Sequence, residues 1–337
     1  MLNKSFFNRE TNITAKIVCD SISPDGVRIT TLEIEYPRFI HGEFMTHRSL
    51  SKNSSSSRAI PIQKMLDQIE NNMAIPIYWG KNKSGMQAVE EVSKFDEAKS
   101  VLNWERSFNY TKERVLDMVD IGLHKQVPNR LTEPFQMMKV VVTGTDWDNF
   151  FNLRIHPDAQ PEICMLAYKI YKTMGESEPV KLKVRDWHLP FVNIGWNGRG
   201  DTTYFNEDFD VIDLEDAIKI SASCCAQVSY RNTDMSLEKA DKIFNMLIKS
   251  DVLHASCFEH LATPVSKEIE IENSDYLTVG FINKASDSNT WEYGITHQNK
   301  SGQLFSGNLR GWISYRQQLQ DNTCWEFDFE DRMKLFN

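Results

Sequence analysis

Residues 46–58 place a histidine, two arginines, an asparagine and six serines around a single leucine (Thr-His-Arg-Ser-Leu-Ser-Lys-Asn-Ser-Ser-Ser-Ser-Arg). Arginine presents a planar fork of donors that stays charged, and serine hydroxyls together with backbone N–H groups can surround phosphate oxygens. The same composition is also typical of a solvated, serine-rich loop. The segment alone therefore leaves two interpretations open, an anion-binding site and a surface loop.

Further segments carry side chains that could bind a ligand or react. They are Lys125–Arg130, Asn149–Arg154 with Ala159–Ile163, Cys225–Tyr230 and His254–His260. Taken singly, each also fits an ordinary role, because arginines often form surface ion pairs and phenylalanines usually lie in the core. The six cysteines include no Cys-x-x-Cys pair and no His/Cys cluster at zinc-ligand spacing. We therefore expect no metal site, no cysteine nucleophile and reduced, mostly buried thiols.

Composition narrows the class of protein. The chain has 337 residues, of which 41% are hydrophobic and 25% charged, as in a soluble globular enzyme, and no apolar run reaches the roughly 20 residues that span a bilayer. A net charge of −9 argues against binding of a nucleic-acid polymer. It allows a small phosphorylated substrate, since charges beyond about 8 Å are largely screened. The polar N-terminus lacks the apolar core of a secretory signal, so we expect a cytoplasmic protein with no membrane partner.

Hydrophobic periodicity predicts the elements that must position these residues. In the first half it predicts strands over 12–19, 27–36 and 135–143, a short helix from Pro37 to about Arg48, two helices within 88–123 that stop at Gly122, and a helix over 146–174 interrupted near Pro157. In the second half it predicts helices over 211–228 and 236–248, strands over 267–271 and 277–282, and a final helix from about Asn308. Without a regular βαβ rhythm, this pattern indicates an α+β fold, with a mixed or antiparallel central sheet flanked by helices.

Together, the polar segments resemble the flavin-dependent thymidylate synthases, whose signature is an Arg-His-Arg triplet, seven residues and a serine. Here it reads Thr46-His47-Arg48, seven residues, Ser56. That family also has an Ala-Arg-Val-Ser-Tyr segment, a His-x-Ser/Thr-Pro-Phe-Glu-His segment and an Asn-Phe-x-x-Leu-Arg…Ala-Gln-x-Glu-Ile helix. Their counterparts are Ala226–Tyr230, His254–His260 and Asn149–Ile163. The family places the first two of these before its arginine-rich motif, so the chain resembles a long member with a rearranged, circularly permuted-like order.

The resemblance implies a thymidylate synthase-like fold in three parts. Residues 1–175 would form the core with the arginine-rich motif and the nucleotide-binding helix, residues 176–210 a linker or lid loop, and residues 211–337 a second part carrying the flavin-binding segments. Residues 308–316 have no assigned counterpart in the family.

The implied reaction is reductive methylation of dUMP to dTMP. Reduced FAD would supply a hydride, with methylenetetrahydrofolate and NADPH as co-substrates, in a homotetramer that binds a pyrimidine deoxynucleoside monophosphate. The resemblance implies catalytic roles for Arg154, His47 and Arg48, flavin contacts from His47, Arg48, Asn53, Asn149, Ser229, His254, Ser256 and Glu259, and nucleotide contacts from Glu43, Ser56, Ser57, Arg58, Arg130 and Arg154.

Departures from the family pattern leave the exact reaction open. Thr46 replaces an arginine, Ser54 a glutamate, Asp158 a histidine and Cys257 a proline, while Glu43 stands where glutamine is expected. A carboxylate at position 43 could accept a hydrogen bond from the cytosine amine but would repel a uracil carbonyl. The alternatives are therefore C5 methylation or hydroxymethylation of dCMP or dUMP, a flavin oxidoreductase without folate chemistry, and a catalytically silent nucleotide-binding subunit.

Overall fold

The computed structural model describes residues 4–85, 88, 90–228, 233–249, 253–266, 291–320 and 322–336. The strands predicted over 267–271 and 277–282, and the site residue Ser229, lie outside these residues. Within the described residues no helix is both long enough and apolar enough to cross a membrane.

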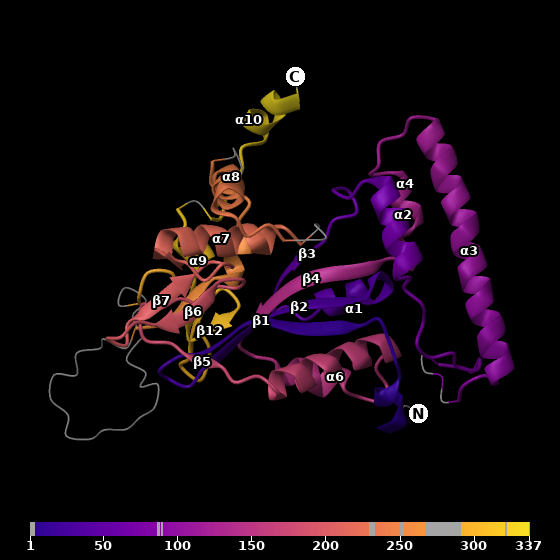
Figure 1. The fold of residues 1–337 in the computed structure, drawn as a ribbon, viewed down its shortest axis with the longest axis horizontal. Helices are drawn as coiled ribbons and strands as arrows, with labels where there is room; N and C mark the ends of the chain where they lie inside the picture. The colour runs from indigo at the N-terminus through magenta and orange to yellow at the C-terminus, as the bar shows by residue number, and fades with distance from the viewer. Residues whose placement is uncertain are drawn as a thin grey trace.

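A five-stranded sheet forms the centre of the molecule, in the order β3-β4-β2-β1-β5 (Figure 1). Its strands are β1 (Thr14–Ile22), β2 (Arg28–Pro37), β3 (Ser51–Ser54), β4 (Met137–Gly144) and β5 (Val180–Lys181). The first four pair antiparallel, and β5 runs parallel to β1. The structure thus confirms the α+β class with a mixed sheet, and also the predicted strands over 12–19, 27–36 and 135–143.

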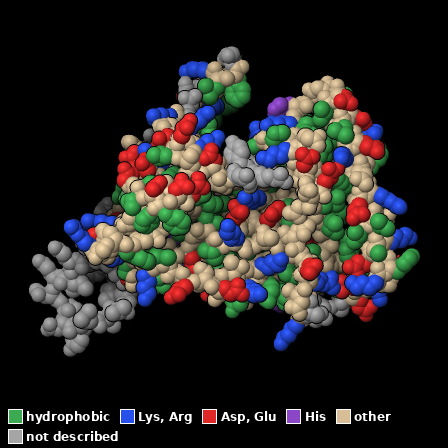
Figure 2. Space-filling model, viewed as in Figure 1, with side chains coloured by type: hydrophobic (Ala, Val, Ile, Leu, Met, Phe, Trp, Pro, Cys, Tyr) green, Lys and Arg blue, Asp and Glu red, His purple; other side chains and the backbone are tan. Residues whose placement is uncertain are grey.

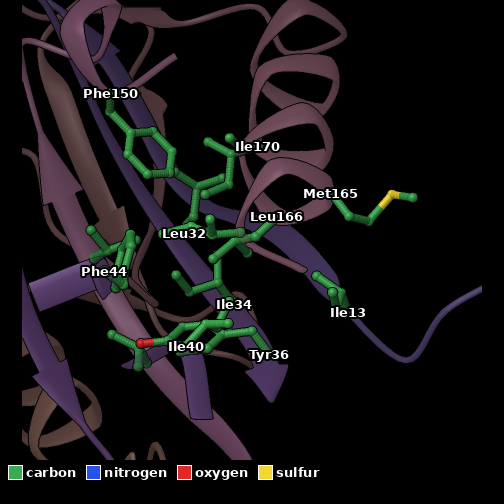
Figure 3. Packing of buried hydrophobic residues seen from close by; sticks show 14 of the residues in the cluster. Ile13, Leu32, Ile34, Tyr36, Ile40, Phe44, Phe150, Met165, Leu166 and Ile170 are labelled. Carbon is green, nitrogen blue, oxygen red and sulfur yellow. The ribbon is translucent and has the colours of Figure 1, made fainter. Parts of the chain in front are cut away.

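One face of the sheet packs on helix α6 (Pro161–Gly175). Leu32 and Ile34 of β2 meet Leu166 and Ile170 of α6, and all four side chains are fully buried (Figure 3). Phe150 of α5 (Asp148–Arg154) closes the same core. The predicted interruption between the two helices is confirmed, because Pro161 lacks the N–H that a continuous helix would need and starts α6 instead.

The chain enters this core directly after β2. A single 3-10 turn, η2 (Arg38–Ile40), leads into the short helix α1 (His41–Met45), and the buried Phe44 of α1 packs edge-to-face on Tyr36 and Phe150. The helix predicted from Pro37 is therefore confirmed, and its packing fixes where the following residues 46–58 begin.

The second face of the sheet carries two separate groups of helices (Figure 1). One group contains α7 (Leu214–Ala226), α8 (Leu237–Ile248) and the 3-10 helix η4 (Ser256–His260), and it covers Val141 of β4. The other contains α2 (Ile62–Asn71), α3 (Lys94–Asp120), α4 (Pro128–Leu131) and η3 (Glu133–Phe135). Ser236 caps α8 by accepting a hydrogen bond from the Lys239 N–H (3.4 Å), as predicted.

Helix α3 corrects the prediction of two helices within 88–123, because it runs without a break for 27 residues. It ends where predicted. The N–H groups of Gly122 and Leu123 donate to the Val119 and Met118 carbonyls, and Gly122 has the left-handed φ of +87°. This is the geometry that favours glycine after a helix.

Two further predictions of secondary structure are wrong. The linker or lid loop predicted over 176–210 contains β6 (Asn193–Trp196) and β7 (Thr202–Phe205), which form a three-stranded sheet with β8 (Val211–Ile212). The helix predicted from 211 therefore begins only at Leu214, as α7. Its polar residues form tight turns, in which the Asn197 side chain accepts the N–H groups of Arg199 and Asp201 (both 2.9 Å). The helix predicted from Asn308 is instead β12 (Leu309–Arg310) and β13 (Trp312–Ser314), since β13 pairs with β9 (Ala262–Pro264) and Trp312 is fully buried.

The remaining short elements are η1 (Lys4–Asn8), β10 (His297–Gln298), β11 (Leu304–Ser306), α9 (Tyr315–Gln318), α10 (Phe329–Met333) and η6 (Lys334–Phe336). All six cysteines are free thiols. Five are buried and Cys324 is exposed, as expected for reduced packing residues. Burial raises the pKa of Cys224 and Cys257 to about 12, so neither is a thiolate at neutral pH.

Candidate functional site

The arginine- and serine-rich segment is built around an edge strand rather than a continuous loop. Residues 51–54 form β3, which pairs with β4 at Ser51↔Thr143 and Asn53↔Val141. Because side chains alternate along a strand, Lys52 and Asn53 point to opposite sides of β3. The segment therefore presents side chains both toward α1 and α5 and toward α7 and η4.

On the first side, Arg154 of α5 bonds to two predicted residues, Glu43 in α1 and His47 just after that helix. Its Nε donates to His47 Nε2 (2.8 Å), and its Nη1 forms an ion pair with Glu43 Oε2 (3.0 Å). The ring of Phe150 packs edge-to-face against His47 at 4.8 Å. Among the described residues, Glu43, His47 and Arg154 are the members of the predicted set that hydrogen bonds join directly.

His47 is a neutral acceptor in this arrangement. An arginine Nε only donates, so His47 Nε2 must accept and the ring proton must sit on Nδ1. Burial, reinforced by the positive charges of Arg154 and Lys52, lowers the pKa of His47 to about 4. At neutral pH the imidazole therefore holds the guanidinium in place and carries no proton on Nε2 to donate.

The buried neutral His47 gives a testable pH dependence. Its pKa is about 4 in the folded state and 6.5 when exposed, so the unfolded chain binds more protons between these values and stability falls as pH drops from 6.5 to 4. We expect His47→Gln to lose less stability than the parent between pH 7 and pH 4.5, measured by urea unfolding at both values. His124→Gln, at an exposed histidine, is the control and should follow the parent. Equal losses in parent and His47→Gln would contradict the assignment.

Lys52 was not predicted and extends the group on this side. Its ammonium donates to the carbonyls of His47 and Leu50, the latter at 3.1 Å, and lies 5.3 Å from the centroid of the Phe44 ring. Burial lowers the pKa of Lys52 to about 8, against the opposing influence of the nearby Glu259 carboxylate. Its place between two motif positions in the sequence was the signal that could have identified it.

On the other side of β3, the structure brings in the downstream segments. The Asn53 Nδ2 donates to the Cys225 carbonyl at the end of α7 (2.6 Å), and η4 packs beside β3. Glu259 of η4 forms an ion pair with Arg316. Asn53 and Glu259 thus lie on the two elements that meet at this strand.

The C-terminal segment without a family counterpart packs against the same region. Asn308 Nδ2 donates to Ser51 Oγ (3.3 Å), and Arg310 forms an ion pair with Asp146 (2.8 Å) just before α5. Together with the contact of Arg316, these interactions tie residues 308–316 to both ends of the candidate site.

A buried polar chain fixes η4 on the sheet. His260 Nδ1 bonds to Thr143 Oγ1 (2.8 Å), Thr143 to Thr31 (2.6 Å), and Thr31 to His188 Nε2 (2.8 Å). All four residues are fully buried, and burial lowers the pKa of both histidines to about 3. A buried hydrogen-bonded network makes the elements that it joins more rigid. This network therefore keeps η4, and with it the neighbouring Glu259, beside β3.

A polar groove opens between the two helix groups on the second face, where Figure 2 shows the surface hollowed. It has a volume of about 280 Å³, with Glu33, Glu35, Met137 and Lys139 of the sheet as its floor, and Arg38, Ser55, Ser57, Gln136 and residues of α2 around it. Burial raises the pKa of Glu35. The predicted residue Ser57 thus lines this groove rather than the Arg154 group.

Arg130 is linked to Arg38, which lines this groove, through a shared carboxylate. Glu133 Oε1 accepts from Arg130 Nη1 (2.8 Å) and Arg38 Nη2 (2.9 Å). The fully buried Asn129 next to it donates to the carbonyls of Ser57 (2.8 Å) and Ile60 (2.9 Å). Asn129 therefore fixes the path of the chain after β3, a role that sequence alone did not indicate.

The other predicted residues are at the surface. Arg48, Ser56, Arg58, Asn149, His254 and Ser256 are exposed. The hydrogen bonds that hold the site together include those of Glu43, His47, Asn53, Arg154 and Glu259.

Residues 27–180 match the family Thy1, described as thymidylate synthase complementing protein. This is the flavin-dependent thymidylate synthase family that the motifs resemble, so the resemblance is confirmed over this segment. The matched range contains Glu43, residues 46–58 and Arg154, and it ends before the Val-Ser-Tyr and Phe-Glu-His segments. No curated protein matches the chain.

Solved structures that resemble the chain include two of the UMP/dUMP methylase PolB from Streptomyces cacaoi. The complex with 5-Br UMP has a TM-score of 0.42 and 15% identity, over 50% of this chain and 90% of the other. The complex with 5-Br dUMP has a TM-score of 0.41 and 16% identity, over 50% and 91%.

Proposed function

We propose that this chain methylates C5 of a pyrimidine deoxynucleoside monophosphate, converting dUMP to dTMP. The observation that carries the proposal is Arg154, held by Glu43 and His47 within the segment that matches the Thy1 family. The proposed enzyme is cytoplasmic, and it is a homotetramer, as the family resemblance implies.

Arg154 suits the proposed role of stabilising the pyrimidine. Its side chain is 21% exposed, so the guanidinium reaches the surface while its Nε and Nη1 are held from behind. A preorganised arginine can stabilise negative charge on a pyrimidine carbonyl as C5 becomes nucleophilic, at little cost in reorganisation. Neutral His47 contributes by orienting this group.

The exposed polar residues fit a bound FAD by their chemistry. Arg48 offers a permanent positive charge suited to a diphosphate, while Asn149, His254 and Ser256 offer exposed donors and acceptors. The Asn53 side chain is already bonded to the Cys225 carbonyl, and Glu259 is paired with Arg316. These two residues would therefore position the surrounding elements. Reduced FAD would supply the hydride, while methylenetetrahydrofolate supplies the carbon and NADPH re-reduces the flavin.

The carboxylate of Glu43 favours one second candidate, dCMP. Glu43 is 37% exposed and lies at the guanidinium proposed to meet the base. One of its oxygens accepts from Arg154, and the other is chemically suited to the cytosine amine. Hydroxymethylation of either base is the corresponding variant of the reaction.

The deciding experiment is a product assay on the purified full chain. The protein is incubated with FAD, NADPH, methylenetetrahydrofolate and either dUMP or dCMP, and products are identified by mass. We expect dTMP from dUMP. With Glu43→Gln, we expect any turnover of dCMP to fall at least about tenfold relative to dUMP, because the amide loses the acceptor charge.

Other outcomes would replace the proposal. NADPH consumption without dependence on methylenetetrahydrofolate would identify a flavin oxidoreductase. Nucleotide binding without a flavin spectrum or any product would identify a silent nucleotide-binding subunit. Gln227→Ala, at a buried residue that bonds to Ser223 and Asp234, controls for changes caused only by a perturbed fold.

A further inference from the structure

Helix α3 has a second face that nothing in the chain covers among the described residues. The helix is about 40 Å long and lies at the edge of the molecule (Figure 1). Its inner face buries Phe108 and Val115 against the cluster of α2 and η3. On the outer side, hydrophobic and charged side chains alternate along the same edge of the surface (Figure 2).

The hydrophobic residues of the outer side follow a seven-residue repeat. Phe95 is 79% exposed, Leu102 51%, Leu116 40% and Leu123, just beyond the helix, 40%. Asn109 occupies the remaining place in the repeat, at its centre. A seven-residue spacing keeps Phe95, Leu102, Asn109 and Leu116 on one stripe of the helix, and Leu123 follows just beyond the end of that stripe. A single polar residue in such a stripe typically fixes the register of pairing.

A second seven-residue series beside this stripe is charged. Lys99 and Arg106 lie in the first half, and Glu113 and Asp120 in the second. All four are exposed, and Lys99, Arg106 and Asp120 make no ion pair within the part of the chain that the structure describes. The sign of the charge thus reverses at the centre of the helix.

We propose that α3 is a self-association surface, on which two copies of the chain pack antiparallel about a two-fold axis at Asn109. Phe95 would then face Leu123 of the partner subunit, and Leu102 would face Leu116 of the partner subunit. In the same register Arg106 meets Glu113 of the partner subunit, and Lys99 meets Asp120 of the partner subunit. In this register each apolar position of the first series meets an apolar one, and each positive charge of the second series meets a negative one.

This pattern selects a second copy as the occupant. A two-fold interface uses the same patch on both chains, so the patch must be complementary to its own reversed order. The apolar series reads the same in both directions, while the charged series reads with opposite sign. An unrelated partner would need neither property. The inference does not depend on the proposed activity.

Charge reversal tests the pairing in the full-length chain. We expect Arg106→Glu to weaken self-association at least about tenfold, because like charges then face each other twice across the axis. Sedimentation at a series of concentrations would show the mass falling to half of the parent's. The double variant Arg106→Glu with Glu113→Arg should restore the parent mass, since each pair is then rebuilt with exchanged signs.

Two further variants complete the test. Leu102→Asp should also halve the mass, and Arg199→Glu, at an exposed arginine outside α3, should leave it unchanged. Circular dichroism checks that each variant is folded. A monomeric parent, a mass unaffected by Arg106→Glu and Leu102→Asp, or a double variant that stays dissociated would each overturn the proposal.

Discussion

Replacing Arg154 by alanine is expected to lower the rate of nucleotide methylation by about 10²–10³-fold, the usual loss when one preorganised donor to a developing negative charge is removed. The fold should survive, because Arg154 and its partner Glu43 are both partly exposed and solvent can satisfy the remaining carboxylate. The measurement is kcat and KM on the full chain with saturating co-substrates. The loss is expected mainly in kcat.

Two variants test whether the effect comes from the donor geometry of Arg154 or only from a positive charge near the substrate. Arg154→Lys keeps the charge but replaces the planar fork of donors by a single ammonium, so it should recover only a small part of the rate. Arg58→Ala, at the residue proposed to hold the nucleotide phosphate, should raise KM and leave kcat close to the parent value. If Arg154→Ala turns over nucleotide like the parent, the assignment of the site is wrong.

Replacing the fully buried Asn129 by alanine is expected to reduce the free energy of unfolding by about 2–4 kcal/mol. Its Nδ2 is the donor to the carbonyls of both Ser57 and Ile60, at 2.8 and 2.9 Å. Without it, two acceptors on the segment that lines the groove lose their partner. Urea unfolding followed by circular dichroism measures the change.

Asn103→Ala provides the matched control, because Asn103 is exposed on α3 and its replacement should change stability by less than about 0.5 kcal/mol. The Asn129 variant should also bind nucleotide less tightly at temperatures where it remains folded, since residues 55–58 would lose their fixed path. A loss of stability below about 1 kcal/mol would show that water replaces the side chain at little cost.

Local signals in the sequence predicted the structure correctly wherever its cause lies within a few residues. The cap of α8 at Ser236 and the end of α3 near Gly122 depend on neighbouring backbone groups, and both were predicted. Strands β1, β2 and β4 were also predicted, because their apolar residues must face a core whichever helix covers it. The mixed α+β class followed from these elements.

Predictions failed where neighbouring elements decide the outcome. Residues 312–314 read as the start of a helix, yet pairing with β9 and burial of Trp312 make them a strand. Residues 176–210 read as a linker or lid loop, yet Asn197 uses its side chain to close a hairpin turn between β6 and β7. The first case depends on β9, a strand distant in the sequence, and the second on the pairing of β6 with β7 across the turn.

The sequence by itself indicated the residues proposed to carry the chemistry, because Glu43, His47 and Arg154 belong to a motif pattern that is visible without coordinates. Only the tertiary structure decided what they do to one another. Arg154 lies 107 residues from His47 and 111 from Glu43 in the chain, and packing of α1 and α5 on one core brings them into contact. Burial and that contact together keep His47 neutral, a property that no local pattern encodes.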